Sequence, residues 1–147
     1  MGALTLPASG IVYVDTVALI YTVERLPPYW PLLDPLWKAA QAGQFEIVSS
    51  DLALMETLVG PLKSGDARLQ NAFEQALLGT EMRLVPISQP ILHEAAQLRS
   101  TTKLRTPDAI HAATGQHVNC VLFITNDIGF RTVPGLPAVI LDDLLKP

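Results

Sequence analysis

Five short apolar runs, rich in β-branched residues, constrain the fold of this chain more than any other feature. They cover residues 11–14, 45–48, 82–85, 121–124 and 138–141, and they lack a regular alternation of apolar and polar side chains. Such runs predict strands covered on both faces, which is typical of a parallel sheet. We therefore expect an α/β fold with a mostly parallel sheet of about five strands.

Segments with helical spacing lie between these runs. Three of them cover residues 32–42, 66–78 and 90–99, and a glycine follows each of the first two. A fourth is predicted to begin at Thr106, with Thr106 as its N-cap and Pro107 at the first helical position. Helices in this order between strands predict a three-layer α/β/α sandwich.

Length and hydropathy indicate one domain outside the membrane. The chain has 147 residues, of which 49% are hydrophobic, and we expect a single domain over residues 1–147. The mean hydropathy of +0.31 is high, but no apolar run approaches the roughly 20 residues that a bilayer requires. No basic residue precedes an apolar core at the N-terminus, so we expect a cytoplasmic protein with no membrane partner.

Charge and cysteine content narrow the function classes. A net charge of −4 argues against a broad basic surface for nucleic acid, although it is compatible with an enzyme that holds metal ions. The single cysteine, Cys120, excludes an internal disulfide and a zinc site of the CxxC type. Because it lies inside the apolar run 120–124, we expect a buried, unreactive thiol.

Four carboxylates follow strands or lie on the helices after them. These are Asp15, Glu56, Asp108 and Asp127. In open α/β sheets, active groups collect beyond the carboxyl ends of the strands, so we expect the four to lie together. Clustered carboxylates repel one another unless a cation or a proton neutralises them, and oxygen ligands suit hard ions. The pattern therefore favours a divalent metal site.

Each acid also has a purely structural interpretation. Asp15 and Asp108 could cap helices or interact with the helix dipole. Asp127 could stabilise a turn, because Asn and Asp are common there. Glu56 lies among apolar neighbours, where an acid needs a partner. These interpretations stay open beside the metal site.

Three motifs, in this order and spacing, resemble the PIN domain family, and within it the VapC-type toxin ribonucleases of toxin–antitoxin pairs. The first is Val14-Asp15-Thr16, followed by Ala18-Leu19-Ile20-Tyr21. The second runs from Leu104 to Ala113 and contains Thr106-Pro107-Asp108. The third is Ile124-Thr125-Asn126-Asp127, with Phe130 after it. The resemblance extends from about residue 11 to the C-terminus.

The resemblance implies a nuclease that hydrolyses RNA with Mg²⁺ or Mn²⁺. Asp15, Glu56, Asp108 and Asp127 would be the catalytic and metal-binding acids, with Asp15 and Asp108 on the main ion. Thr125 would support the last acid. His111 lies three residues after Asp108 on the same helical face, where it either orients a ligand or is a structural histidine.

The substrate would be RNA, whose phosphates require cations. Candidate substrate-binding residues lie near the two later acids: Arg99, Lys103, Arg105 and Arg131. Ordinary surface charge is the alternative for each of them. For the whole chain, the alternative to an endoribonuclease is a catalytically silent PIN-like module that binds RNA or protein.

The resemblance also implies partners. We expect a homodimer and a small cognate antitoxin, as in type II toxin–antitoxin pairs. The apolar segment 20–37, which contains two tryptophans, has more hydrophobic surface than a small core obviously needs, so we expect it to face a partner chain.

Overall fold

The computed structural model describes residues 2–147, so the first residue of the predicted domain lies outside the described range. Within that range the strands are β1 (Ile11–Val14), β2 (Glu46–Ser50), β3 (Arg83–Val85), β4 (Leu122–Thr125) and β5 (Ala138–Ile140). The helices are α1 (Thr16–Val23), α2 (Trp30–Gln41), α3 (Leu52–Ser64), α4 (Ala67–Leu78), α5 (Gln89–Thr101), α6 (Thr106–His117) and α7 (Leu141–Leu144), with a 3₁₀ turn at Ile128–Thr132.

The strands form one parallel sheet in the order β3-β2-β1-β4-β5. β1 is central, with Tyr13 paired to Val48 of β2 on one side and to Phe123 of β4 on the other. The predicted five-stranded parallel sheet is therefore confirmed. This order places the ends of β1, β2 and β4 side by side, so the segments that follow them lie at one edge.

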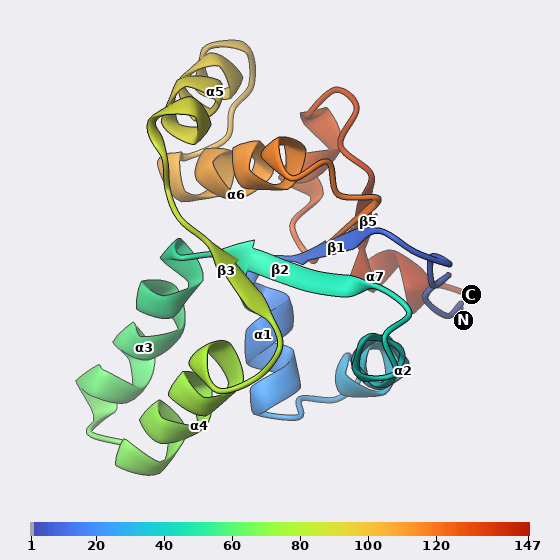
Figure 1. Cartoon of the computed structure of the whole chain (residues 1–147), viewed down its shortest axis with the longest axis vertical. Coiled ribbons are helices and arrows are strands. Elements are labelled where there is room, and N and C mark those ends of the chain that lie inside the picture. The colour runs from blue at the N-terminus through green and yellow to red at the C-terminus, as the bar shows by residue number, and fades with distance from the viewer. Residues whose placement is uncertain (1) are drawn as a thin grey trace.

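Helices cover both faces of the sheet, as Figure 1 shows, with α5 and α6 on one face and α1 to α4 on the other. Neighbouring residues of β1 belong to opposite cores: Tyr13 packs under α5 and α6, whereas Val12 and Val14 pack toward the other helices. This division is why the runs lack alternation, since both faces of each strand are covered. The predicted three-layer sandwich is confirmed.

Details of the elements differ slightly from the expectations. The N-cap of α6 is Arg105 rather than Thr106, and Thr106 instead accepts a hydrogen bond from the Arg99 side chain at 3.0 Å.

Cys120 is buried as expected, and burial raises the pKa of its thiol to about 11. In the described part of the chain, none of the helices is long and apolar enough to span a membrane.

Helix α6 lies unusually close to the sheet at Gly115. A Cβ atom at that position would lie 2.9 Å from Cδ2 and 3.1 Å from Cε2 of the Phe123 ring. The ring is held in place, because it stacks on Tyr13 with 4.8 Å between centroids and 3° between planes. The missing side chain at Gly115 therefore sets how close α6 comes to β1 and β4.

We expect Gly115→Ala to lower the free energy of unfolding by about 1–3 kcal/mol, because the methyl group overpacks the core. The matched control is Gly60→Ala in α3, where a Cβ would meet no atom within 4 Å beyond its chain neighbours and the backbone of its own helix. That change should raise stability by roughly 0.5–1 kcal/mol, since alanine favours the helix. Urea titration of both variants measures the difference, and equal effects would contradict the close packing of α6.

Candidate functional site

The four predicted acids come from segments that follow the adjacent strands β2, β1 and β4, or from the start of α6. Asp15 is the residue directly after β1, and Asp127 comes two residues after β4. Glu56 lies on α3, which follows β2, and Asp108 lies in the first turn of α6. All four therefore gather at the carboxyl edge of the sheet.

Asp15 is 7% exposed and bound through both of its carboxylate oxygens. Oδ1 accepts the backbone N–H of Thr16 at 2.7 Å, so Asp15 caps α1, and Oδ2 accepts the hydroxyl of Thr125 at 2.8 Å. Thr125 also accepts the backbone N–H of Asp127 at 3.2 Å. The predicted supporting residue Thr125 thus contacts two of the four acids.

Glu56 contacts two polar side chains from other helices. Its Oε1 accepts the Thr16 hydroxyl at 2.8 Å and lies 2.6 Å from Nε2 of His111. Burial raises the pKa of Glu56, but the hydrogen bond and positive charge of His111, together with the Thr16 hydroxyl, lower it further than burial raises it. The pKa of Glu56 is therefore below its ordinary value, and the carboxylate is ionised.

His111 lies at the centre of this cluster and is 1% exposed. Besides Glu56, its Nε2 lies 3.1 Å from the Thr16 hydroxyl and 3.6 Å from Oδ1 of Asp15. Burial lowers the pKa of His111, but the hydrogen bond to Glu56 and the charges of the surrounding acids outweigh burial and raise it. The surrounding acids therefore favour the protonated form of His111.

Two residues of this cluster were not predicted from the sequence. Thr16 donates to Glu56, and the Tyr13 hydroxyl lies 2.6 Å from Nδ1 of His111. The ring of Tyr13 is fully buried and packs on Phe123. The available signal was chemical: a phenol in a strand buried on both faces needs a polar partner for its hydroxyl.

Asp108 and Asp127 complete the group. Burial, followed by the charges of Asp127, Asp15 and Glu56, raises the pKa of Asp108, although His111 acts in the opposite direction. Asp127 stabilises the turn after β4, because its Oδ1 accepts the backbone N–H of Gly129 at 2.8 Å. The four carboxylates thus interact electrostatically, and two of them also have the structural roles of cap and turn residue.

The donor chemistry of these residues fits a hard divalent cation such as Mg²⁺ or Mn²⁺, because all four offer carboxylate oxygens. As the side chains lie, no three His, Cys, Asp or Glu groups within residues 2–147 stand close enough to hold one ion. Asp15, Glu56 and Asp127 each have an oxygen bound to a protein donor.

The four predicted substrate-binding cations divide into two pairs. Arg99 donates to the Leu104 carbonyl and to Thr106, which holds the loop before α6, and Arg131 pairs with Asp143. Lys103 and Arg105 are exposed, and neither makes a side-chain hydrogen bond or ion pair with the described residues. Of the four, these two are available to a phosphate.

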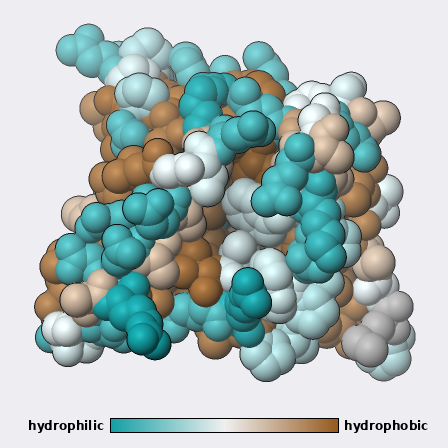
Figure 2. All heavy atoms as spheres, turned by 60° about the horizontal axis from the view of Figure 1, so that its bottom comes forward, coloured by the Kyte–Doolittle hydropathy of each residue, from teal (hydrophilic) through white to brown (hydrophobic). Residues whose placement is uncertain are grey.

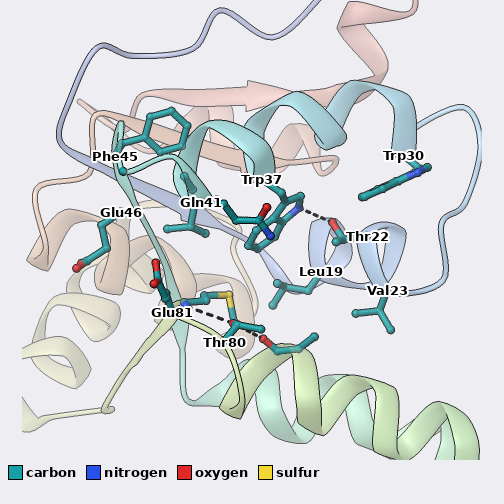
Figure 3. A pocket seen from close by; sticks show the side chains of 15 residues that line it. Leu19, Thr22, Val23, Trp30, Trp37, Gln41, Phe45, Glu46, Thr80 and Glu81 are labelled. Atoms are coloured by element: carbon teal, nitrogen blue, oxygen red, sulfur yellow. Dashed lines mark hydrogen bonds between the residues drawn. The ribbon is translucent and has the colours of Figure 1, made fainter.

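A separate apolar cavity of about 810 Å³ lies at the other side of the molecule, between α1, α2, α4 and the start of β2. Trp30 and Trp37, from the apolar segment 20–37, line it, and Trp37 donates to Thr22 at 2.9 Å (Figure 3). Glu46 and Glu81 lie at one end. None of the four site acids lines this cavity.

The most exposed large apolar side chains lie outside segment 20–37, which is mostly packed in the core. On α3, Met55 (64% exposed), Val59 (48%) and Leu62 (58%) recur at helical spacing, and we call them the α3 stripe. Figure 2, which brings the side with α3 and α4 forward, shows apolar residues at the surface between hydrophilic ones. Exposed apolar surface that a partner chain could cover therefore lies on α3.

Comparison with solved structures finds the same fold in toxin–antitoxin proteins. A VapBC2 chain from Rickettsia felis, in a complex bound to a promoter DNA fragment, superimposes with a TM-score of 0.70 at 19% identity, covering 88% of this chain and 98% of that one. A chain of a toxin–antitoxin complex from Klebsiella pneumoniae gives 0.64 at 26% identity, with coverages of 88% and 97%. VapC20 of Mycobacterium tuberculosis, described as a toxin that cleaves the sarcin–ricin loop, gives 0.70 at 16% identity, with coverages of 86% and 97%.

The sequence itself identifies the family. No curated protein has a sequence that matches this chain. The PIN domain profile, however, matches residues 12–136, a range that includes all but the first residue of β1, all four acids and the turn after β4. The chain therefore belongs to the PIN domain family.

Proposed function

We propose that the protein is a divalent-metal-dependent endoribonuclease that acts in the cytoplasm as the toxin of a type II toxin–antitoxin pair. The observation that carries the proposal is the electrostatic coupling of the acids: Asp127, Asp15 and Glu56 all raise the pKa of Asp108. Carboxylates held together in this way favour a bound cation. Membership of the PIN domain family and the fold shared with VapC20 support the same reaction class.

In this proposal, Asp15 and Asp108 hold the main Mg²⁺ or Mn²⁺ ion, and Glu56 and Asp127 complete its shell or hold a second ion. When bound, the ion would supply an activated water and neutralise charge on the phosphodiester. Thr125 keeps Asp15 oriented through the 2.8 Å hydrogen bond to Oδ2. Lys103 and Arg105 bind RNA phosphates, whereas Arg99 and Arg131 mainly hold the protein's own loops.

The apolar cavity is the proposed binding surface for the antitoxin. The Klebsiella relative is a toxin–antitoxin complex, and the Rickettsia relative is a VapBC assembly. The cavity offers two tryptophans and a volume of about 810 Å³, which suits apolar side chains of a partner segment. A basic side chain from a different part of the antitoxin would enter the group of acids and form a charge-assisted contact there.

The nuclease proposal predicts cleavage of single-stranded RNA with Mg²⁺ or Mn²⁺ and no cleavage in EDTA. Asp15→Asn and Asp108→Asn should each lose most activity, because a neutral amide is a poorer ligand for a hard cation. Glu81→Gln, an exposed acid at the far end of the strands, is the matched control and should stay active. Gel analysis of labelled RNA measures the outcome. RNA that is bound but left intact by the folded wild type with Mn²⁺ would instead favour the catalytically silent module.

Stability tests the metal site without a substrate. In EDTA, Asp108→Asn should melt at a higher temperature than the wild type, because it removes one charge from a repelling group. Mn²⁺ at a hundredfold excess over its dissociation constant should stabilise the wild type by about 2.7 kcal/mol. The melting temperature should rise by roughly 2–4 °C for each kcal/mol of this stabilisation. Asp108→Asn should respond much less, and Glu81→Gln should respond like the wild type. Identical melting of wild type and Asp108→Asn in both conditions would contradict a metal site.

We also propose a homodimer, and the α3 stripe is the surface that supports it. Val59→Lys should convert a dimer into a monomer, because a buried interface would have to desolvate the new charge. Leu92→Lys on α5 is the matched control, since Leu92 is 47% exposed and Val59 is 48% exposed. Light scattering at micromolar concentration measures the mass. A monomeric wild type, or equal effects of both lysines, would rule out this interface.

A further inference from the structure

The hydrogen bonds of Glu56 continue through His111 to one further buried residue, Tyr13. Tyr13 of β1 contacts Nδ1 of His111 through its hydroxyl at 2.6 Å, and Nε2 of the same ring contacts Oε1 of Glu56 at 2.6 Å. The imidazole is thus held at both nitrogens, by a phenol on one side and a carboxylate on the other. A phenol, a ring and an acid from β1, α6 and α3 form one hydrogen-bonded chain.

Proton placement in this chain follows from donor chemistry. An ionised carboxylate only accepts, so Nε2 of His111 carries the hydrogen that points to Glu56. The Tyr13 hydroxyl can donate to Nδ1 of a neutral ring or accept from Nδ1 of a charged ring, and in both cases it fixes the same ring orientation. Burial and the charge of Asp15 raise the pKa of Tyr13 well above its ordinary value, so the phenol keeps its proton.

Tyr13 is itself rigid. Its side chain is completely buried, and its ring stacks on Phe123 at 4.8 Å with nearly parallel planes. Phe123 in turn lies against α6 at Gly115. The hydroxyl therefore has a fixed position relative to the helix that carries His111.

The orientation of His111 affects Glu56 through one carboxylate oxygen. The hydrogen bonds from Thr16 and His111 both end on Oε1, and within the described chain Oε2 has no hydrogen-bond partner. A carboxylate anchored through one oxygen presents the other in a defined direction. Glu56 therefore has one oriented oxygen, and it shares the imidazole nitrogen of His111 with Asp15, whose Oδ1 lies 3.6 Å from that nitrogen.

We propose that Tyr13 is a positioning residue that acts through His111 to orient Glu56 toward the bound metal ion. The inference rests on the proposed function, because it assigns the metal to the four acids. Outer partners that orient metal ligands commonly change metal affinity by about 10–100-fold. Tyr13 is then part of the metal site without touching the ion.

The test measures Mn²⁺ binding by calorimetry, with no RNA present. Tyr13→Phe removes only the hydroxyl and keeps the stacked ring, and we expect it to weaken Mn²⁺ binding by about tenfold or more. Tyr29→Phe is the matched control, because it removes a hydroxyl that donates to Asp142 at 2.7 Å, outside the acidic group. That variant should bind Mn²⁺ like the wild type.

A double variant separates positioning from packing. His111→Gln keeps an N–H donor for Glu56 but has no second ring nitrogen for Tyr13, so adding Tyr13→Phe should cause no further loss of Mn²⁺ affinity. If Tyr13 acted by packing alone, its loss would be the same in both backgrounds, and the proposal would be overturned. Should His111→Gln fail to fold, the imidazole ¹⁵N signals of His111 in metal-free Tyr13→Phe decide. They should shift relative to the wild type, and unchanged signals would overturn the proposal.

The outcomes also distinguish this inference from the proposed function. A wild type that binds no Mn²⁺ would overturn both. A wild type that binds Mn²⁺ while Tyr13→Phe binds it equally well would overturn the positioning role alone.

Discussion

The hydrogen bond between His111 and Glu56 joins two helices that pack on opposite faces of the sheet. Such a contact can form only beyond the strand ends, because elsewhere the sheet separates the layers. Burial disfavours the charged form of each partner, yet the pKa of His111 is raised and that of Glu56 is lowered, so each stabilises the charge of the other. When His111 is protonated, its charge offsets part of the repulsion between Glu56 and Asp15.

The four acids do not benefit equally from the contact with His111. Asp15 and Glu56 lie within 3.6 Å and 2.6 Å of His111, whereas burial and the neighbouring acids raise the pKa of Asp108. Excess negative charge is therefore concentrated at the start of α6, beside the exposed Lys103 and Arg105. An ion or a basic side chain that entered the group would relieve its repulsion most at Asp108.

The three-layer fold and the common location of the four acids could both be predicted from the sequence, for related reasons. Runs without alternation report burial on both faces, and the carboxyl edge of a parallel sheet collects whatever follows its strands. The partners of Glu56 could not be read in the same way, because Thr16 and His111 lie 40 and 55 positions away and meet it only through packing. The uses of Arg99 and Arg131 likewise depend on which loop each side chain reaches. The apolar segment 20–37 packs partly against the core, and its Trp30 and Trp37 line the cavity proposed for a partner, so the expectation that it faces a partner stays a prediction.

Helix α6 has no solvent face along most of its length, because every residue from Ala109 to Gly115 is buried. It is confined between β1, β4 and α5 much as a central strand is confined between its neighbours. A helix packed in this way has little freedom to slide or rotate. Asp108 in its first turn can therefore adjust to a ligand only by rotation about its own side-chain bonds. Glu56 stands on a helix with one open side. If the acids bind metal as proposed, adjustment to ions of different radius would therefore fall mainly to α3.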